Sequence, residues 1–496
     1  MGIPPQAWNT GQVSPQTNLD PIPPAYNPPD SPGNHHWIFY VFLFLFISAA
    51  AAAIGYGASF YMNRQNSGIP KPLTGTPTPI ISAFQIEPTI PVSPDSTSSA
   101  IPLTPPPQAL VDKLVNSHNV FGLNLFQKLT ANNKNENIFI SPLSITLALS
   151  MVYNGSGTTT KSAIGNTLNL TGLTTEELNQ LHSYQLHKYS QSSADTTLKI
   201  ANSLWLRNIF QGQTVTLNPT FSSQMQADYG AKIAAMNFDD PKTVDVINGW
   251  VSDATNNKIK NIINPPIDPN NLLILINAIY FKGNWSIPFD KKLTVKDFFT
   301  NSNNQKVEAS VMKQSDDYLY FEDRTLQMIS LPYGKNQESS MMIILPKTDT
   351  ATYLKSFTLD KWKSLITKLG MTHGTLSLPV FSNDYEIQLN DILKSMGMSI
   401  AFDGNKADFN KILDLDKSPV KSGLYIGKVL HKSYINVDEQ GTEAAAVTSV
   451  NMAISSSIGS NPIKFTMEVN KPFIYMIVDN KTQELLFIGI MNTAKT

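Results

Sequence analysis

The distribution of proline divides this chain. The first 107 residues contain 20 of its 33 prolines, and most of these lie in two blocks, residues 1–36 and 63–107. Because proline fixes φ and carries no amide hydrogen, neither block is suited to a packed helix or sheet. We therefore expect a disordered proline-rich tail at 1–36 and an extended Pro/Thr/Ser-rich stalk at 63–107. The folded domain is predicted at 108–496, which holds the other 13 prolines.

Between the two proline blocks lies an uncharged apolar stretch of 26 residues, 37–62, WIFYVFLFLFISAAAAAIGYGASFYM. As a helix it would be about 39 Å long, enough to cross a lipid bilayer with some tilt. We predict a single transmembrane helix. The alternative is a cleaved signal peptide, but the 36-residue leader contains no Lys or Arg, unlike a typical signal peptide. Arg64 and Lys71 weakly favour a cytoplasmic C-terminal side; the composition of the stalk and the function inferred below favour an extracellular domain, which we expect.

Composition and motifs exclude several classes of chemistry. The chain has no cysteine and a formal net charge of -1, so thiol chemistry is absent and no nucleic-acid partner is expected. The seven histidines show no metal-ligand spacing, and no phosphate-binding or dinucleotide-binding motif occurs. We predict no cofactor and no enzyme. One alternative stays open, a hydrolase using Ser141 and His431, although Ser141 before Pro142 is predicted to be a helix N-cap.

Hydrophobic periodicity indicates a mixed fold. Residues 109–129 have helical spacing, and a second helix is expected from Pro142 to Asn154-Gly155. Continuous apolar runs at 272–285, 341–346, 473–478 and 485–490 predict strands buried on both faces. The last two runs are separated by DNKTQE, which suggests an antiparallel hairpin. This order of elements predicts an α+β fold with large sheets covered by helices.

An unusual run of small residues, DEQGTEAAAVTSV, occupies positions 438–450. Read as a strand, it has alternating faces, and one face is small or apolar throughout: Thr442, Ala444, Ala446, Thr448, Val450 and Met452. Such a face could enter an already packed sheet, which tolerates little added volume, and Gly441 could act as the hinge. The next stretch, NMAISSSIGSNP, is predicted to be exposed and open to cleavage. The alternative is an ordinary Ala-rich turn leading into a Ser/Gly linker.

Four segments resemble the serpin family in its own order: NENIFISPLSITLALSMVYNGS (135–156), LLILINAIYFKGNW (272–285), HKSYINVDEQGTEAAAV (431–447) and NKPFIYMIVDNKTQELLFIGIMN (470–492). The resemblance covers roughly residues 109–492. It implies a serpin-like fold with three β-sheets, eight or nine helices and a mobile reactive loop. It also implies suicide inhibition of a serine protease, sometimes a cysteine protease. The protease cleaves the loop and forms a covalent acyl complex, and the loop then inserts into the central sheet as a new strand.

The resemblance also implies roles for individual residues. The reactive-loop hinge corresponds to Glu439, Gly441, Thr442, Ala444, Ala445 and Ala446. A polar cluster that gates opening of the central sheet corresponds to Ser141, Ser144, Asn277 and His431. Trp285 corresponds to the tryptophan at the loop entrance. We expect a monomer whose protein partner is the target protease and whose lipid contact is residues 37–62.

The position of the scissile bond has two candidate assignments. Counting 16 residues on from Glu439 gives Ser455–Ser456, whereas counting back from Asn470 points near Ile458 and Gly459. Because residues 454–459 contain no Lys or Arg, elastase-like or subtilisin-like targets are favoured over trypsin-like ones. The alternative function is a non-inhibitory serpin-fold protein that acts as a binding or chaperone-like protein. The absence of cysteine and the single span favour a prokaryotic source.

Overall fold

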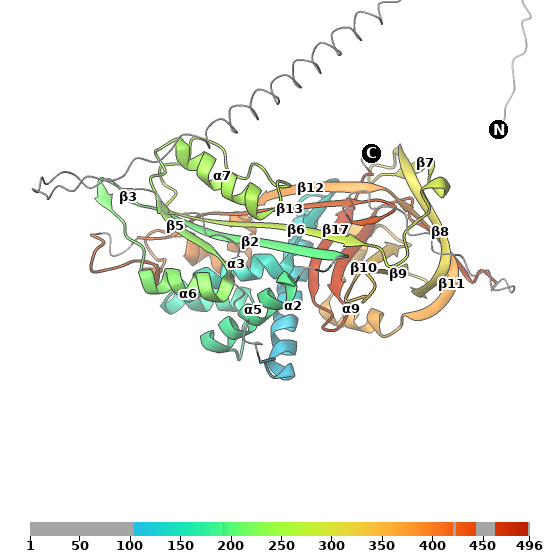
Figure 1. Cartoon of the computed structure of the whole chain (residues 1–496), viewed down its shortest axis with the longest axis horizontal. Helices are drawn as coiled ribbons and strands as arrows, with labels where there is room; N and C mark the ends of the chain where they lie inside the picture. The colour runs from blue at the N-terminus through green and yellow to red at the C-terminus, as the bar shows by residue number, and fades with distance from the viewer. Residues whose placement is uncertain (1–103, 192, 194, 420–422, 443–461, 495–496) are drawn as a thin grey trace, which may run out of the picture. The chain divides into compact units, whose positions relative to one another are not determined.

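The computed structural model describes residues 104–191, 193, 195–419, 423–442 and 462–494 (Figure 1). The predicted tail, membrane span and most of the stalk lie outside these residues. Within them, no helix is both long enough and apolar enough to span a bilayer. The α-helices of the described part are α2 (Gln108–Asn132), α3 (Pro142–Gly155), α4 (Thr158–Thr167), α5 (Thr175–Ser190), α6 (Pro219–Tyr229), α7 (Lys242–Ala254), α8 (Thr350–Leu354), α9 (Leu359–Ile366) and α10 (Asn390–Leu393).

The described strands form three sheets. The six-stranded sheet has the order β12 (Phe381–Gln388), β13 (Ile426–Val437), β14 (Gly441–Thr442), β6 (Leu273–Asn284), β2 (Thr196–Arg207) and β5 (Lys232–Met236). The nine-stranded sheet contains β1 (Ile138–Ile140), β17 (Leu485–Met491), β16 (Phe473–Asp479), β10 (Ser339–Pro346), β9 (Leu326–Tyr333), β8 (Lys306–Glu322), β11 (Gly370–Pro379), β15 (Phe465–Glu468) and, paired to β8, β7 (Val295–Thr300). The third is the short pair β3 (Ile209–Phe210) and β4 (Gln213–Thr214). This α+β arrangement agrees with the expected fold.

Local sequence accounts for the ends of α3, the helix predicted at the Ser-Pro signal. Ser141 is its N-cap, and the Ser141 side chain accepts a hydrogen bond from the Ser144 amide. Pro142 occupies the first helical turn, where its missing amide hydrogen costs nothing. The helix ends at Gly155. The N-cap prediction is therefore confirmed.

The six-stranded sheet is a middle layer between two groups of helices, and β6 shows why its sequence is apolar throughout. Alternate residues Ile274 and Ile276 join the small core that includes Ile247 of α7, whereas Leu273 and Leu275 join the main core with α3. Figure 1 shows α7 on one side of β2 and β6 and α3, α5 and α6 on the other. Because both faces are covered, a strand here needs an unbroken apolar run instead of alternation.

The C-terminal hairpin lies in the interior of the nine-stranded sheet. Strands β16 and β17 pair antiparallel, from Phe473 opposite Met491 onward, which confirms the predicted hairpin. All seven residues of each strand are buried. Helices α2 and α3 both contact β17.

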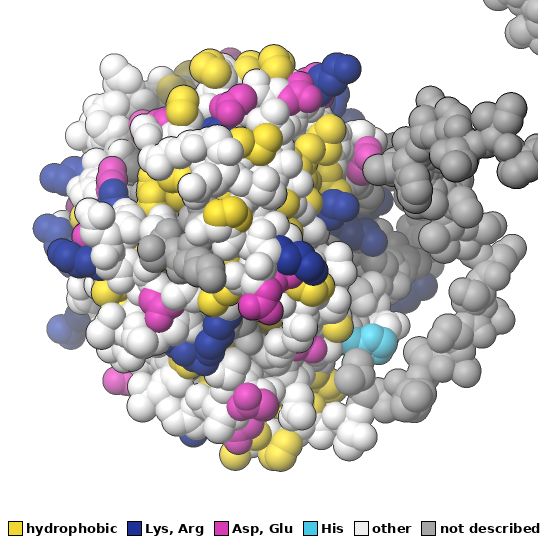
Figure 2. Space-filling view, turned by 90° about the vertical axis from the view of Figure 1, so that its left-hand side faces the viewer, with side chains coloured by type: hydrophobic (Ala, Val, Ile, Leu, Met, Phe, Trp, Pro, Cys, Tyr) yellow, Lys and Arg dark blue, Asp and Glu magenta, His cyan; other side chains and the backbone are white. Residues whose placement is uncertain are grey.

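Figure 2 faces the end of the domain where β3 and α6 lie in Figure 1. Its surface there shows basic and acidic side chains interspersed with separate apolar ones.

Candidate functional site

The six-stranded sheet already contains the start of the predicted hinge. After β13 the chain turns back, and β14 pairs with both neighbours: Thr442 lies opposite Val437 of β13 and opposite Gly283 of β6. Thr442 is fully buried. Beyond β14, strands β6 and β13 pair directly with each other in parallel. The sheet is therefore closed along most of its length, with two hinge residues seated at one end of the seam between β6 and β13.

Gly441 is required by close packing at this point. Its φ is +153°, and a β-carbon built on it would approach the carbonyl oxygen of Gly283 to 2.0 Å. No larger residue fits there without moving the backbone. The tight turn before it is closed by the amide of Asp438, which donates to the Gly441 carbonyl at 2.9 Å. The sequence argument assigned this glycine to hinge freedom, and the structure adds a steric reason.

Trp285 lies beside the end of the seam where Gly441 and Thr442 are seated, which we call the hinge entrance. Its ring stacks on Tyr333, with 4.6 Å between centroids. Its Nε1–H donates to the carbonyl of Asp438 and its amide donates to the carbonyl of Gln440, both at 2.9 Å. Trp285 is only 4% exposed, so it is a core aromatic and an entrance residue at once.

Tyr333 and Glu439 complete the entrance. The Tyr333 hydroxyl lies 2.6 Å from Thr442 Oγ1, and burial raises the pKa of that phenol, which keeps it protonated. Thr294 Oγ1 donates to the Glu439 carboxylate at 2.7 Å. The role of Tyr333 was not predicted from the sequence, because Tyr333 lies 109 residues from Thr442 along the chain and no spacing pattern connects the two.

The four residues predicted to gate the sheet lie together in its interior. His431 of β13 sits opposite Asn277 of β6, and its Nδ1 lies 2.6 Å from Asn277 Oδ1. Ser144 Oγ donates to the same oxygen at 2.7 Å. The amide of Ser141 faces His431 Nε2 at 3.4 Å. All four residues are buried, so they form a polar clasp across the β6–β13 seam, anchored on α3.

Hydrogen-bond polarity fixes the state of His431. Asn277 Nδ2 donates to the Ser144 carbonyl and to Asn202 Oδ1, so Asn277 Oδ1 is an acceptor and His431 Nδ1 must donate to it. Nε2 then accepts from the Ser141 amide, and the imidazole is neutral. Burial lowers the pKa of His431 to about 3, in agreement with this assignment.

The same geometry bears on the hydrolase alternative. The Ser141 hydroxyl donates to the carbonyl of Leu486 at 2.6 Å and accepts from the Ser144 amide. It makes no bond to the His431 ring, which faces the Ser141 backbone amide instead. Both side chains are fully buried. A catalytic serine needs its hydroxyl beside the base and open to substrate, so this pair does not have the geometry of a nucleophile and its base.

Comparison with known proteins identifies the family. A family description, Serpin (serine protease inhibitor), matches residues 116–493. The chain belongs to the serpin family. Iripin-2 of Ixodes ricinus is 30% identical over 388 residues, covering 77% of this chain and 93% of the relative. Human Serpin B11 is 31% identical over 394 residues, covering 74% and 96%. A serpin-like protein of Methanosarcina mazei is 30% identical over 391 residues, covering 76% and 86%.

Solved structures agree with this assignment. The native-state structure of Tengpin, a thermophilic serpin, is 34% identical, covers 79% of this chain and 95% of its own, and has a TM-score of 0.68. Human thyroxine-binding globulin, at 24% identity and a TM-score of 0.69 over 78% of this chain, shares the fold. Serpins are generally protease inhibitors and not catalytic enzymes.

Several residues of the serpin hinge and cleavage region lie outside the described part of the chain. The hinge residues concerned are Ala444, Ala445 and Ala446, and the scissile-bond candidates are Ser455, Ser456, Ile458 and Gly459. Their roles stay predictions. The described flanks are Thr442 on one side and Pro462 on the other, where the Lys464 amide donates to the His373 carbonyl at 2.9 Å.

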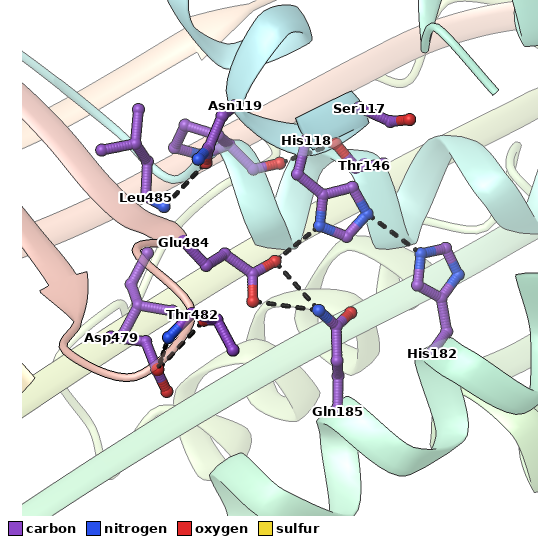
Figure 3. A network of polar contacts seen from close by, with 12 residues as sticks. Ser117, His118, Asn119, Thr146, His182, Gln185, Asp479, Thr482, Glu484 and Leu485 are labelled. Carbon is purple, nitrogen blue, oxygen red and sulfur yellow. Dashed lines mark hydrogen bonds and ion pairs between the residues drawn. The ribbon is translucent and has the colours of Figure 1, made fainter. Parts of the chain in front are cut away.

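A second buried polar cluster was not predicted from the sequence. His118 of α2 contacts Glu484, with 2.6 Å between Nδ1 and Oε1, and its Nε2 lies 3.2 Å from His182 Nε2 of α5 (Figure 3). Gln185 Nε2 donates to both oxygens of Glu484. Burial, and then the neighbouring His118, lowers the pKa of His182 well below its usual value. The cluster ties α2 and α5 to the turn between β16 and β17. In the described residues no group of three or more His, Asp or Glu side chains could hold a metal ion.

Proposed function

We propose that this serpin is a suicide-type inhibitor of serine proteases that acts by inserting its cleaved loop between β6 and β13. One observation carries the proposal: Thr442 already lies between these strands, at the end of a seam along which β6 and β13 pair directly with each other. Insertion of further residues would replace that pairing with two new sets of backbone hydrogen bonds. The native form would be kinetically trapped until cleavage frees the loop.

The clasp supports the same mechanism. Opening the seam must separate His431 from Asn277, which are joined at 2.6 Å inside the sheet. Breaking a buried polar contact is costly until new partners form, so this contact contributes to the barrier that holds the native form. The small face predicted for Ala444 and Ala446 would pass between the strands without overpacking.

The target class follows from the chemistry of residues 454–459. That window offers Ser, Ile and Gly but no cation. We propose elastase-like or subtilisin-like proteases, which accept small or aliphatic residues, and cleavage at Ser455–Ser456 or beside Ile458. A cysteine protease of similar preference is a further target class.

The test is incubation of the purified protein with elastase, subtilisin and, as a control, trypsin. Elastase or subtilisin should give a complex that survives denaturing gel electrophoresis, and mass spectrometry of the released peptide should locate the scissile bond. Ala444→Arg should be cleaved without forming the complex, because arginine is too large for the small face that is predicted to enter between β6 and β13. Thr220→Arg, on the exposed start of α6, should still form it. Cleavage of the unaltered protein without any covalent complex would favour the non-inhibitory alternative.

We propose further that the inhibitor is a monomer tethered by residues 37–62, with the serpin domain outside the cell, and that its source is prokaryotic. The stalk at 63–107 would reach about 35–40 Å as a random coil, enough for the loop to meet proteases near the surface. Membrane fractionation and protease accessibility of intact cells test the tether and its orientation. Recovery of the full chain in the soluble fraction would contradict the tether.

A further inference from the structure

Two histidine rings are stacked inside the polar cluster that ties α5 to the rest of the domain. His118 of α2 and His182 of α5 are both fully buried. Their ring centroids lie 5.3 Å apart, with an angle of 21° between the planes, and their Nε2 atoms face each other at 3.2 Å (Figure 3). A hydrogen bond between two ring nitrogens needs one donor and one acceptor. The contact therefore exists only while at least one of the two rings is neutral.

The outer nitrogen atoms of the pair have unequal partners. His118 Nδ1 lies 2.6 Å from Glu484 Oε1, so a positive charge on His118 would be paired. His182 Nδ1 lies 3.2 Å from the hydroxyl of Tyr229, a neutral group. Among the described residues the His182 ring contacts no carboxylate. Because a buried charge without a partner is costly, the cluster accommodates one imidazolium and not two.

The donors that Glu484 already accepts prevent it from serving both rings. Gln185 Nε2 donates to both of its oxygen atoms, and the Tyr189 hydroxyl donates to Oε2 at 2.7 Å. With His118 on Oε1, the carboxylate accepts from three side chains. A second imidazolium on His182 would gain no anion from this side of the cluster.

The other nearby carboxylate, Asp479, is also engaged elsewhere. It is paired with the Lys188 ammonium group and accepts from the amide and the hydroxyl of Thr482. The remaining charged or titratable groups on the elements around α5 make no contact with the His182 ring: Asp112, Lys113 and Lys128 on α2, Tyr153 on α3, Glu176, Glu177, Tyr184 and His187 on α5, Lys199 and Arg207 on β2, Asp228 on α6, and Lys481 in the β16–β17 turn.

From this geometry we propose that the His118–His182 contact makes the attachment of α5 sensitive to pH: when both rings are protonated the contact breaks, and α5 separates from α2 and from the β16–β17 turn. The attached pair holds at most one extra proton, whereas two water-exposed rings hold two below a pH of about 6.5. Separation therefore takes up at least one proton, and acid favours it. Burial already lowers the pKa of His182, which is the direction that this argument requires.

The size of the effect follows from the proton count. Uptake of one proton raises the separated population at least about 10-fold for each pH unit below about 6.5. Free carboxylates stay ionised down to a pH of about 5, so the interval between these values belongs to the imidazole rings. Helix α5 covers one side of β2 (Figure 1), so its separation would uncover part of the six-stranded sheet. This inference does not depend on the proposed inhibitory function.

Amide hydrogen exchange of the full chain, read by mass spectrometry from pH 7.5 to pH 5, tests the proposal. Exchange times are matched for the change of the intrinsic exchange rate with pH. Protection in α5 should fall at least about 10-fold per pH unit below about 6.5. His182→Gln, which cannot take up the second proton, should lose this dependence, while His187→Gln, an exposed change on the same helix, should keep it. Only slopes are compared, so a less stable variant is still informative. An equal slope in His182→Gln, or constant protection in the unaltered protein, would refute the proposal.

A second measurement needs no variant. Exchange of the histidine C2 hydrogen follows the protonation of each ring in the unaltered protein. The two rings should both become protonated only over the pH range in which α5 loses protection. If His118 and His182 are both protonated while α5 stays protected, the cluster accommodates two imidazolium groups and the proposal is wrong.

Discussion

Replacing Gly441 by alanine tests the account of the hinge entrance most directly. The added β-carbon would meet the Gly283 carbonyl oxygen at 2.0 Å, and the alanine would have to keep a φ of +153°. The oxygen belongs to the backbone and the position of the β-carbon is fixed by its own backbone, so no side-chain rotation relieves the contact. We expect β14 to leave the seam. That leaves the Tyr333–Thr442 hydrogen bond unmade, at about 1–3 kcal/mol for buried polar groups.

The magnitude can be set against a matched glycine. Gly230 has a φ of +57°, and nothing lies within 4 Å of the position that a β-carbon would occupy, so Gly230→Ala costs only backbone strain, about 1–2 kcal/mol. That strain acts at the end of α6 and leaves the hinge untouched. For Gly441→Ala we expect local opening of the entrance to become easier by about 3 kcal/mol, which corresponds to on the order of 100-fold faster exchange.

Native-state hydrogen exchange at the amide of Trp285 provides the assay. This amide donates to the Gln440 carbonyl only while the hinge turn is in place. It should lose protection in Gly441→Ala and keep it in Gly230→Ala. Equal protection in Gly441→Ala and the unaltered protein would refute the argument that β14 is packed against Gly283.

Three further predictions concern single buried contacts. Between pH 6.5 and about 3 the unfolded chain protonates His431 and the folded protein does not, since burial depresses its pKa; stability should therefore fall by about 1.4 kcal/mol per pH unit on acidification through this range. Urea unfolding measured as a function of pH should give a slope that is smaller in His431→Gln than in the unaltered protein by about 1.4 kcal/mol per pH unit, the contribution of one proton. Tyr333→Phe leaves Thr442 Oγ1 without its partner and should increase exchange at Thr442 by roughly 10-fold, whereas an unchanged rate would contradict the bond. Glu484→Gln places an amide against the donors of His118 and Gln185 and should destabilise α5 by about 3 kcal/mol, seen as faster exchange in that helix but not in α7.

Much of the fold could be predicted from local patterns. The helix cap at Ser141, the apolar run of β6 and the β16–β17 hairpin each depend on neighbours within a few positions, so their signals are continuous in the sequence. The resemblance to serpins predicted that Ser144, Asn277 and His431 would cooperate. The structure supplied the bonds, and with them the neutral tautomer of His431.

Other contacts left no trace in spacing. Asn202 extends the clasp through a bond to Asn277 at 2.6 Å, and His118 reaches Glu484 across 366 positions of sequence. Each of these residues alone is an ordinary polar side chain on a helix, a strand or a turn. Its role depends on which distant donor or acceptor is brought within bonding distance.

Proline content, apolar periodicity and a run of small side chains are properties of short stretches, and from them the sequence predicts a proline-rich leader, a folded domain and a strand able to enter a sheet. Packing between segments far apart in the chain decided the rest. It determined whether that strand has a place to enter and which aromatic ring forms the entrance. Local propensity acts through neighbouring residues, whereas burial and hydrogen-bond pairing are satisfied only when the whole core assembles.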